Sequence, residues 1–431
     1  MDKTTETKVT RRGFLKTSTA VAGAAMMADA AARLAMGQAS DKMRIGLLGC
    51  GGRGVDAVRN CVASSPGVEL VAVADLFKFQ ADGAFNGLKN LGAAFKVTPD
   101  KCFSGLDCHK KLAATDVDLV VTAAPPGFRP MHLRACVEAG KHVFMEKPVG
   151  VDPVGCRSVI ESGRIAAQKN LGIVAGTQRR HQFPYVETVK RLHDGAAGDI
   201  LAAYCYWNGG GIWFRAKDGR FKDLSDFEWQ CWNWYHWDWL SGDHIVEQHV
   251  HNLDVIQWVM KGPPQKIMGM GGRASRDMNG VIPGNIFDHF AIEFEWPGGV
   301  RVLSECRHSP NSADRVNEYV VGTKGKSNCC GNIWGETKWD YSGPNPNPYV
   351  QEHADLIKSI RDGKPLNEAE QVANSTLMAV GGRMSAYTGR EFSWEWLLKS
   401  SKLEIFPKEE NLKPGPGIFP PVAIPGKTEL I

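Results

Sequence analysis

The chain has 431 residues, of which 43% are hydrophobic and 23% charged, the proportions of a globular protein with about two domains. The formal net charge is only +4 and no run of basic residues occurs, so nucleic acid is not an expected partner. The 11 cysteines include no C-x-x-C pair and no zinc-site spacing, so no structural metal is expected, and which thiols pair, if any, stays open.

The N-terminus has the pattern of an export signal. Residues 10–16, TRRGFLK, match the twin-arginine consensus, and an alanine-rich, weakly apolar stretch follows to about Ala35. Asp29 and Arg33 interrupt this stretch, which makes it too short and too polar for a stable membrane anchor. Residues 1–39 are therefore predicted to be a twin-arginine signal peptide. This implies handling by the Tat export machinery and a periplasmic or otherwise extracytoplasmic location.

The next part of the chain alternates between apolar strands and helices. A helix is predicted at residues 130–139, and short apolar runs predict buried strands at residues 43–48, 68–75, 117–124 and 142–146. Alternation of this kind predicts an α/β domain with a doubly wound parallel sheet and right-handed crossovers. The predicted Rossmann domain spans residues 43–165.

After the helix predicted at residues 153–168, the pattern changes to longer strand-like runs separated by turns. Helices are predicted at residues 185–193, 353–361 and 369–387, and strands at residues 172–177, 200–207, 266–271, 288–295, 300–306 and 318–321. Because the later strands lack regular helices between them, a large, mostly antiparallel open sheet is predicted. It forms a C-terminal α/β domain at residues 166–405, and the Pro- and Gly-rich residues 406–431 are predicted to be a tail.

A glycine-rich turn follows the first predicted strand. Its G-x-G-x-x-G motif stands between a strand and a helix start, and Asp75 closes the next strand. Glycines let the backbone approach a pyrophosphate, and the helix N-terminus stabilises its charge. Asp75 can accept hydrogen bonds from both adenosine ribose hydroxyls and would repel a 2′-phosphate, so NAD is favoured over NADP. Cofactor contacts are predicted at Gly49, Cys50, Gly51, Gly52, Arg53, Gly54 and Asp75; a glycine turn in a domain without a nucleotide is the alternative.

Two further segments carry side chains suited to proton transfer. Lys147 follows a predicted strand, at the edge where open α/β sheets bind ligands, and its ammonium can orient a carbinol oxygen. Glu247 and His251 stand four residues apart, so they share one face if this segment is helical. A carboxylate beside an imidazole raises the imidazole pKa, so His251 is the predicted general base, assisted by Lys147 or Glu247.

The residues around this pair form an unusual cluster of histidines and acids: Asp243, His244, Glu247, His249 and His251. A metal site is an alternative explanation, because histidine and carboxylate ligation is common. Proton transfer without a metal is the preferred interpretation. His249 is then a second candidate, beside Glu247, for the residue that completes the proton relay.

Together these motifs resemble the Gfo/Idh/MocA (glucose–fructose oxidoreductase/inositol dehydrogenase) superfamily. The ordered series covers nearly all of the chain after the signal: Gly46-x-x-Gly49-x-Gly51, Ala124-Pro125 with His132, residues 139–143, Glu146-Lys147-Pro148, Gln178-x-Arg180 and Glu247…His251…Asp254. The resemblance implies a nicotinamide cofactor, a sugar or polyol substrate, Lys147 beside the nicotinamide and His251 facing the reacting hydroxyl. It adds cofactor contacts at Ala124, Pro125, His132, Glu146, Lys147 and Gln178. The family usually has Asp where Glu247 stands and a small residue where His249 stands.

Residues 227–239 contain five tryptophans and a tyrosine. Aromatic faces stack on the apolar faces of sugar rings, and indole adds an N–H donor. One hypothesis is a carbohydrate platform beside the catalytic segment; the others are a packed aromatic loop that supports the site, or an oligomer contact. Substrate contacts are predicted at Arg180, Trp213, Arg215, Trp239 and His244.

The predicted function combines these features. The twin-arginine route exports folded proteins, commonly with cofactor loaded, and no pool of free NAD is expected outside the cytoplasm. NAD is therefore expected to be tightly bound, and to be reduced and reoxidised in one site. We expect an NAD-dependent oxidoreductase acting on a sugar or glycoside hydroxyl, with C3 as one candidate carbon. The alternatives are an NAD-dependent glycosidase with a transient 3-keto intermediate and a non-catalytic sugar-binding protein. An open sheet needs covering, so a homodimer or homotetramer is expected.

Overall fold

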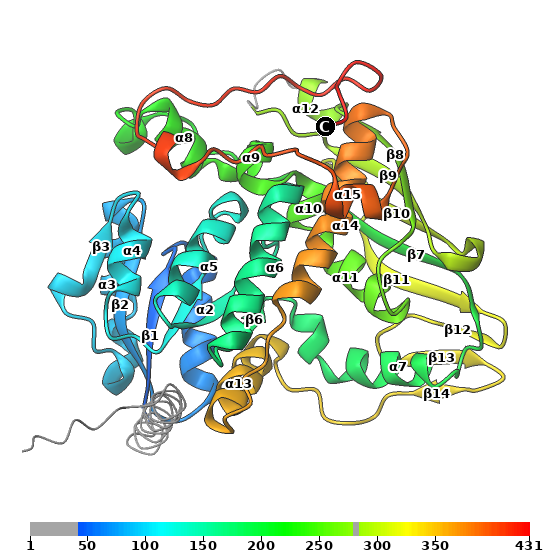
Figure 1. Ribbon diagram of the computed structural model, residues 1–431, viewed down its shortest axis with the longest axis horizontal. Coiled ribbons are helices and arrows are strands. Elements are labelled where there is room, and N and C mark those ends of the chain that lie inside the picture. Colours follow the sequence, from blue (N-terminus) through cyan, green and yellow to red (C-terminus); the bar gives the residue numbers. More distant parts are fainter. Residues whose placement is uncertain (1–41, 279–283) are drawn as a thin grey trace, which may run out of the picture. The chain divides into compact units, whose positions relative to one another are not determined.

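The computed structural model describes residues 42–278 and 284–431, which form one sheet of six strands and one of nine (Figure 1). The signal peptide predicted for residues 1–39 lies outside the described residues and stays a prediction. Within the described ranges, no helix has both the length and the apolar character that a membrane span requires.

The first sheet has the strand order β3-β2-β1-β4-β5-β6. Its strands are β1 (Met43–Leu48), β2 (Val68–Asp75), β3 (Cys102–Ser104), β4 (Leu119–Thr122), β5 (His142–Met145) and β6 (Ile173–Ala175). The pairs β2–β3, β1–β4, β4–β5 and β5–β6 run parallel, which confirms the predicted Rossmann-type sheet. The strand order reverses direction between β1 and β4. In sheets of this kind, ligands bind in the crevice at the carboxyl ends of the two strands that flank the reversal. The sheet includes β6, beyond the boundary predicted at residue 165.

Helices cover this sheet because its strands are apolar on both faces. They are α2 (Gly52–Ser64), α3 (Lys78–Gly87), α4 (Cys108–Ala113), α5 (Arg129–Glu138) and α6 (Pro153–Gln168). Helices α4, α5 and α6 pack side by side, and α2 packs against α13 (Pro348–Arg361) from the end of the chain. One helix that packs on the first domain, α13, thus comes from the part of the sequence predicted to form the second domain.

The second sheet has the order β14-β13-β12-β11-β7-β10-β9-β8-β15. Its strands are β7 (Ile200–Gly209), β8 (Lys266–Gly272), β9 (His289–Glu295), β10 (Arg301–His308), β11 (Arg315–Gly322), β12 (Gly325–Ser327), β13 (Asn332–Gly335), β14 (Trp339–Asp340) and β15 (Phe392–Ser393). The pair β7–β10 is parallel and the other pairs are antiparallel, which confirms the mostly antiparallel sheet. Strands β12 to β15 have two to four residues, too short for a periodic signal.

The expectation that the later strands lack helices between them was wrong for the connection from β7 to β8. It contains α8 (Asp226–Trp232), α9 (Asp238–Ser241), α10 (His244–Glu247) and α11 (Val250–Val259). Helix α11 and the long α14 (Ala369–Thr388) pack together, and α14 also contacts β8 and β9. Their buried side chains form the main core of the second domain. The remaining helices are α7 (Phe183–His193), α12 (Ser275–Met278) and α15 (Trp394–Lys399).

The C-terminal residues run back across both domains, as the red trace over α9 and α8 shows (Figure 1). The backbone N–H groups of Ile405 and Phe406 donate to Asp152 Oδ2 at 2.8 and 3.1 Å. The Phe406 ring packs against Phe128, with centroids 5.0 Å apart, and against Trp239 at 6.0 Å. The tail is therefore attached to the first domain near the start of α6.

A buried ion triad joins the end of the first sheet to two C-terminal helices. His181 Nδ1 lies 2.7 Å from Asp355 Oδ2 on α13, and His181 Nε2 lies 3.3 Å from Glu368 Oε1 beside α14. Burial opposes the charged imidazolium, but the hydrogen bonds and charges of the two carboxylates outweigh it and raise the pKa of His181 to about 10. The charged ring therefore stabilises the junction at neutral pH.

We expect His181→Asn to lower the free energy of unfolding at neutral pH by about 3 kcal/mol, because two carboxylates lose their cation. A folded-state pKa above the unfolded value means that this stabilisation is complete below about pH 6.5 and is lost as the pH rises through about 10. Urea unfolding of both proteins across this range measures the difference, which should shrink toward high pH. A constant difference would contradict a charged His181.

Candidate active site

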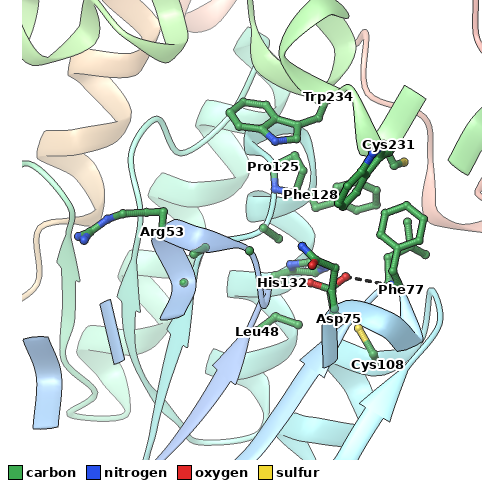
Figure 2. Close-up of a pocket in the computed structure, with 18 of the residues that line it drawn as sticks. Leu48, Arg53, Asp75, Phe77, Cys108, Pro125, Phe128, His132, Cys231 and Trp234 are labelled. Atoms are coloured by element: carbon green, nitrogen blue, oxygen red, sulfur yellow. Dashed lines mark hydrogen bonds between the residues drawn. The ribbon is translucent and has the colours of Figure 1, made fainter. Parts of the chain in front are cut away.

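The carboxyl ends of β1, β2 and β4 border a cavity of about 310 Å3 (Figure 2). The first domain contributes the glycine turn after β1, Asp75 at the end of β2, and the segment after β4. The second domain contributes residues from the connection between β7 and α9. The predicted cofactor residues among the lining residues are Gly49, Gly51, Gly52, Arg53, Gly54, Asp75, Ala124, Pro125 and His132.

The glycine turn fits a dinucleotide. Gly49 has a φ of +93°, and a Cβ there would lie 2.5 Å from Ala124 N. A Cβ at Gly54 would lie 1.9 Å from Gly49 O, so a side chain at either position would separate α2 from the strand ends. A Cβ at Gly52 would meet nothing within 4 Å, and one at Gly51 only Gln80 Nε2 at 3.8 Å. The turn thus leaves open space at the N-terminus of α2, where backbone N–H groups can hold a pyrophosphate.

Asp75 connects the end of β2 to this turn. Its Oδ2 accepts from Cys50 N at 2.7 Å and its Oδ1 accepts from Phe77 N at 2.8 Å. Burial raises the pKa of Asp75 to about 6, although both N–H donors oppose the shift. The predicted neighbours Cys50 and Asp75 are therefore in contact, with the carboxylate beside the cavity (Figure 2).

Sequence reasoning missed Arg129, which holds the strand ends together. Its Nε donates to Ala124 O at 2.9 Å and its Nη1 to Pro148 O at 2.5 Å, so it bridges the segments after β4 and β5. Its position in the first turn of α5, shortly after the predicted Ala124-Pro125 motif, could have indicated a role near the strand ends. His132, one turn later, stacks on Phe128 with centroids 5.7 Å apart. Burial, with the charges of His109 and Arg129, lowers the pKa of His132 well below 6.5, so its ring is neutral.

The structure brings Lys147 and Glu247 together across 100 residues of sequence. Lys147 Nζ donates to the backbone oxygen of Glu247 at 2.6 Å and lies 3.3 Å from its Oε1. Lys147 follows β5, and Glu247 ends α10 of the second domain. Both side chains are nearly buried. The ammonium is therefore held at the sheet edge by a group of the other domain.

The predicted relation between Glu247 and His251 was wrong. Helix α10 ends at Glu247 and α11 begins at Val250, so the two residues do not belong to one regular helix. The Glu247 carboxylate contacts Lys147. Burial, with the positive charges of Lys147, Arg179 and Arg53, holds the pKa of His251 well below 6.5 instead of raising it. His251 is a neutral base, stacked on Trp207 with centroids 5.7 Å apart.

His249 does not complete a relay with Lys147. Its ring is fully buried against the second sheet, where Nε2 lies 2.8 Å from Ser304 Oγ and 3.7 Å from Cys205 Sγ. Burial lowers its pKa to about 3. The prediction of a catalytic role is corrected by this geometry, because a ring hydrogen-bonded to β10 points into the core.

The remaining members of the histidine and acid cluster separate in the fold. Asp243 Oδ2 accepts from Phe287 N at 2.8 Å and from Tyr387 Oη at 2.6 Å, in the core. His244 Nδ1 lies 2.9 Å from Tyr235 Oη, and its Nε2 lies 3.3 Å from Trp207 O. Within residues 42–278 and 284–431, no group of three or more His, Cys, Asp or Glu side chains is arranged to hold a metal ion. Within this cluster, His244 and His251 therefore both contact Trp207, His244 through the backbone oxygen and His251 through the ring.

Arg180, a predicted substrate residue, is engaged elsewhere. Its Nε and Nη2 pair with the Asp254 carboxylate at 2.9 and 3.0 Å, and its guanidinium lies 4.9 Å from the Trp258 ring centre. Arg180 thus forms a buried ion pair, and its contact with substrate stays a prediction. The neighbouring Arg179, which sequence reasoning missed, pairs with Glu318 and lies 5.8 Å from the centre of the Trp207 ring.

Three predicted cofactor residues, Arg53, Glu146 and Gln178, lie in one network beside the glycine turn. Arg53 Nε donates to Glu146 Oε1 at 2.5 Å, its Nη2 lies 3.4 Å from Glu352 Oε1, and its guanidinium lies 5.0 Å from the Tyr349 ring centre. Gln178 Nε2 donates to Tyr349 Oη at 3.4 Å. Glu352, on α13, completes this network, and no local sequence signal connected it to the turn.

Comparison with known proteins identifies the family. A model described as "Oxidoreductase family, NAD-binding Rossmann fold" matches residues 43–171, and one described as "GFO/IDH/MocA C-terminal domain" matches residues 185–327. The chain belongs to the Gfo/Idh/MocA family. Its first domain is accordingly an NAD-binding Rossmann domain, which confirms the predicted cofactor.

Individual relatives agree with this assignment. Inositol 2-dehydrogenase of Pseudomonas syringae pv. syringae is 30% identical over 163 residues, which are 38% of this chain and 45% of that protein. The chain spans about half the length of the curated relatives it matches.

Two solved structures show the same fold. Scyllo-inositol dehydrogenase from Lactobacillus casei with NAD(H) and scyllo-inositol has a TM-score of 0.61 and 20% identity, over 82% of this chain and 99% of that one. Aldose–aldose oxidoreductase from Caulobacter crescentus with glycerol has a TM-score of 0.63 and 17% identity, over the same shares of both chains.

The tryptophan-rich segment of this Gfo/Idh/MocA protein divides between core and cavity. Trp239 is 1% exposed and packs against Phe227 and Phe406, so its predicted substrate contact is wrong. The predicted residues Trp213 and Arg215 line the same cavity as the glycine turn. The segment therefore lies over the dinucleotide site, and it is a packed loop in part.

We expect NAD binding to weaken below about pH 6, because protonation of Asp75 removes an acceptor for the ribose hydroxyls. The affinity should fall by up to about tenfold per pH unit below the pKa, and Asp75→Asn should bind weakly without this pH dependence. Titration of tryptophan quenching by NAD measures both. Asp82→Asn, on the exposed face of α3, is the matched control and should keep the wild-type pH profile.

Proposed function

We propose that the protein oxidises a hydroxyl of a sugar, polyol or glycoside. Bound NAD supplies the hydride acceptor for this reaction. The observation that carries the proposal is the Lys147 ammonium, held against Glu247 at the sheet edge, together with the neutral imidazole of His251, whose pKa that ammonium helps to lower. A pure binding protein needs neither a buried ammonium nor a neutral base at this place.

The chain's own residues divide the work of proton transfer. Lys147 donates a hydrogen bond to the carbinol oxygen and favours its negative charge as the proton leaves. His251 is uncharged at neutral pH, because burial and nearby cations disfavour its protonated form. A ring nitrogen is therefore free to receive the proton, and the same surroundings favour its rapid release. Glu247 holds Lys147 in place through its backbone oxygen and its carboxylate.

The substrate class is supported by two features. The similar proteins carry the names inositol 2-dehydrogenase, scyllo-inositol dehydrogenase and aldose–aldose oxidoreductase, which all act on polyols or sugars by name. In this chain Trp207 lies beside His251 and Arg179, and an indole face suits the C–H face of a sugar ring. The carbon that reacts is proposed to be C3 of a glycoside or its equivalent.

The N-terminal sequence extends the proposal to the setting of the reaction. We propose export by the twin-arginine route into the periplasm, with NAD loaded before export and retained. Each oxidation is then followed by reduction of a second carbonyl compound in the same site, which returns the bound dinucleotide to its starting state.

We expect purified protein with bound NAD to show reduced-nicotinamide absorbance when a substrate from a panel of inositols, aldoses and nitrophenyl glycosides is added. Lys147→Ala and His251→Ala should each lower the rate by about 10²- to 10⁴-fold, because each removes a proton-transfer group. Lys261→Ala and His193→Ala, near the far end of α11, are controls that should keep the wild-type rate.

The outcomes separate the competing functions. Release of nitrophenol would identify a glycosidase with a transient keto intermediate. Full turnover by Lys147→Ala would contradict the assigned chemistry. Binding of a sugar with no change in nicotinamide absorbance would favour a non-catalytic sugar-binding protein.

The open face of the second sheet supports a proposed homodimer or homotetramer. Met268 and Met270 on β8 and Leu303 on β10 are 42%, 70% and 36% exposed, and the register aligns Met268, Glu293 and Leu303 across three strands. Exposed apolar side chains gathered on one face of an open sheet are typical of an association surface.

We expect Met270→Glu combined with Leu303→Glu to convert the oligomer to monomer, because the charges would be buried at the interface. Analytical ultracentrifugation measures the change in mass. Leu201 lies on the same sheet, so Leu201→Glu is unsuitable as a control. Val422→Glu, on the exposed C-terminal tail, should keep the wild-type mass. A wild-type monomer at high concentration would contradict the proposal.

A further inference from the structure

A segment of the second domain borders the dinucleotide cavity of the first. Residues 213–234, here called the aromatic lid, line the same cavity as Gly51, Gly52 and Asp75 through Trp213, Arg215, Cys231, Trp232 and Trp234. Figure 2 shows Trp234 on the side of the cavity opposite Leu48. Neither the packing of the fold nor the proposed proton transfer explains why these aromatic residues and Arg215 line the cavity.

Aromatic rings attach the lid to the first domain beside Asp75. The Trp232 ring lies edge-on to Phe77 and Phe79, with centroids 5.8 and 5.2 Å apart, and Phe221 lies 5.9 Å from Phe79. Trp232 Nε1 is buried and has no hydrogen-bond partner among the described residues. In NAD-binding Rossmann domains, an acidic residue at the end of the second strand faces the adenosine ribose, and Asp75 has this place at the end of β2. The cluster therefore lies at the adenosine half of the site.

Arg215 brings a positive charge that no acid among the described residues neutralises. Its guanidinium lies 4.0 Å from the Trp213 ring centre and 4.3 Å from the Trp232 ring centre, and its Nη1 donates to Trp232 O at 2.6 Å. Within the described ranges, no carboxylate lies at ion-pair distance from it. A half-buried cation without a counter-charge is costly, so an anion in the cavity would be stabilised there.

The pyrophosphate of NAD is the anion that this arrangement fits. Arg53, the cation on the glycine turn, already pairs with Glu146 and Glu352. The Asp75 carboxylate accepts from two backbone N–H groups. Arg215 is therefore the lining cation that remains available, and a guanidinium fork suits phosphate oxygens.

The C-terminal tail fastens the lid. Gln230 Nε2 donates to Ile418 O at 2.5 Å, and Ile418 N donates to Gln230 Oε1 at 2.8 Å. The Phe419 ring packs edge-on against Trp237 at 5.5 Å, and Phe227 N donates to Gly415 O at 3.2 Å. Residues 405–419, here called the strap, are also attached to the first domain at Asp152 and through Glu409 to Lys110.

We propose that the aromatic lid, fastened by the strap, closes over bound NAD, with Arg215 as counter-charge of the pyrophosphate and Trp232 against the adenosine half. Release of the dinucleotide then requires the lid and strap to separate from the first domain. This deepens the proposed retention of NAD and rests on that part of the proposed function. It also gives the tryptophan-rich segment a role in holding the cofactor.

The test measures dinucleotide release without any sugar. Full-length protein is loaded with NADH and mixed with excess NAD, and loss of energy transfer from tryptophan to NADH gives the release rate. Arg215→Met should accelerate release and weaken binding of NAD and ADP-ribose by about 10- to 100-fold, because it removes a charge-assisted hydrogen bond. It should leave the affinity for adenosine unchanged.

Two further variants separate the lid from the strap. Trp232→Ala should weaken adenosine, ADP-ribose and NAD alike. Phe419→Ala, at a side chain that is 59% exposed, should accelerate NADH release while the apo protein keeps its melting temperature. Arg191→Met and Trp339→Ala are matched controls, because Arg191 lies 4.1 Å from the Trp339 ring centre and neither residue lines the cavity.

Wild-type release by Arg215→Met, or equal weakening of adenosine and ADP-ribose, would overturn the assignment of Arg215. Wild-type release by both Trp232→Ala and Phe419→Ala would overturn the lid. Because no substrate is present, failure to oxidise any sugar leaves this inference standing. Fast NADH release from the wild type would contradict retention itself.

Discussion

The contact between Lys147 and Glu247 is the interaction on which the site depends. A lysine at the end of a buried strand would be costly without a partner, and the first domain supplies none at ion-pair distance among the described residues. The backbone oxygen and the carboxylate of Glu247 come from the second domain, at 2.6 and 3.3 Å. The Lys147 ammonium therefore has its position only when both domains are folded and α10 lies beside the sheet edge.

The histidines near this contact share one electrostatic condition. Burial is the largest influence on His244, His249 and His251, and it lowers the pKa of each ring. Their different roles follow from their hydrogen bonds. His249 is fixed to β10, His244 is fixed to Tyr235, and His251 stacks on Trp207 with its Nδ1 unpartnered among the described residues. The lowered pKa keeps the His251 ring in the uncharged form that a proton acceptor requires, and it also makes the ring a weak base.

The lid and the strap give the second domain a part in cofactor binding as well as in proton transfer. Gly49 and Gly54 make the close backbone approach possible, and indole rings and Arg215 of the second domain also line the cavity. The strap crosses from Asp152 to Gln230 and joins the same two domains a second time. In the proposed mechanism this one interface both positions Lys147 and limits dinucleotide exchange, so the proposed retention of NAD would depend on the integrity of the whole fold.

Sequence alone determined the features that depend on neighbours along the chain. The apolar strands, the glycine turn and Asp75 follow from local patterns, and parallel strands bring their carboxyl ends to one edge. The tertiary structure decided which side chains from distant elements contact each other and which are buried. It directed Glu247 to Lys147, paired Arg180 with Asp254 and buried Trp239. The reason is that burial and ion pairing depend on residues tens to hundreds of positions away, and local periodicity carries no information about those partners.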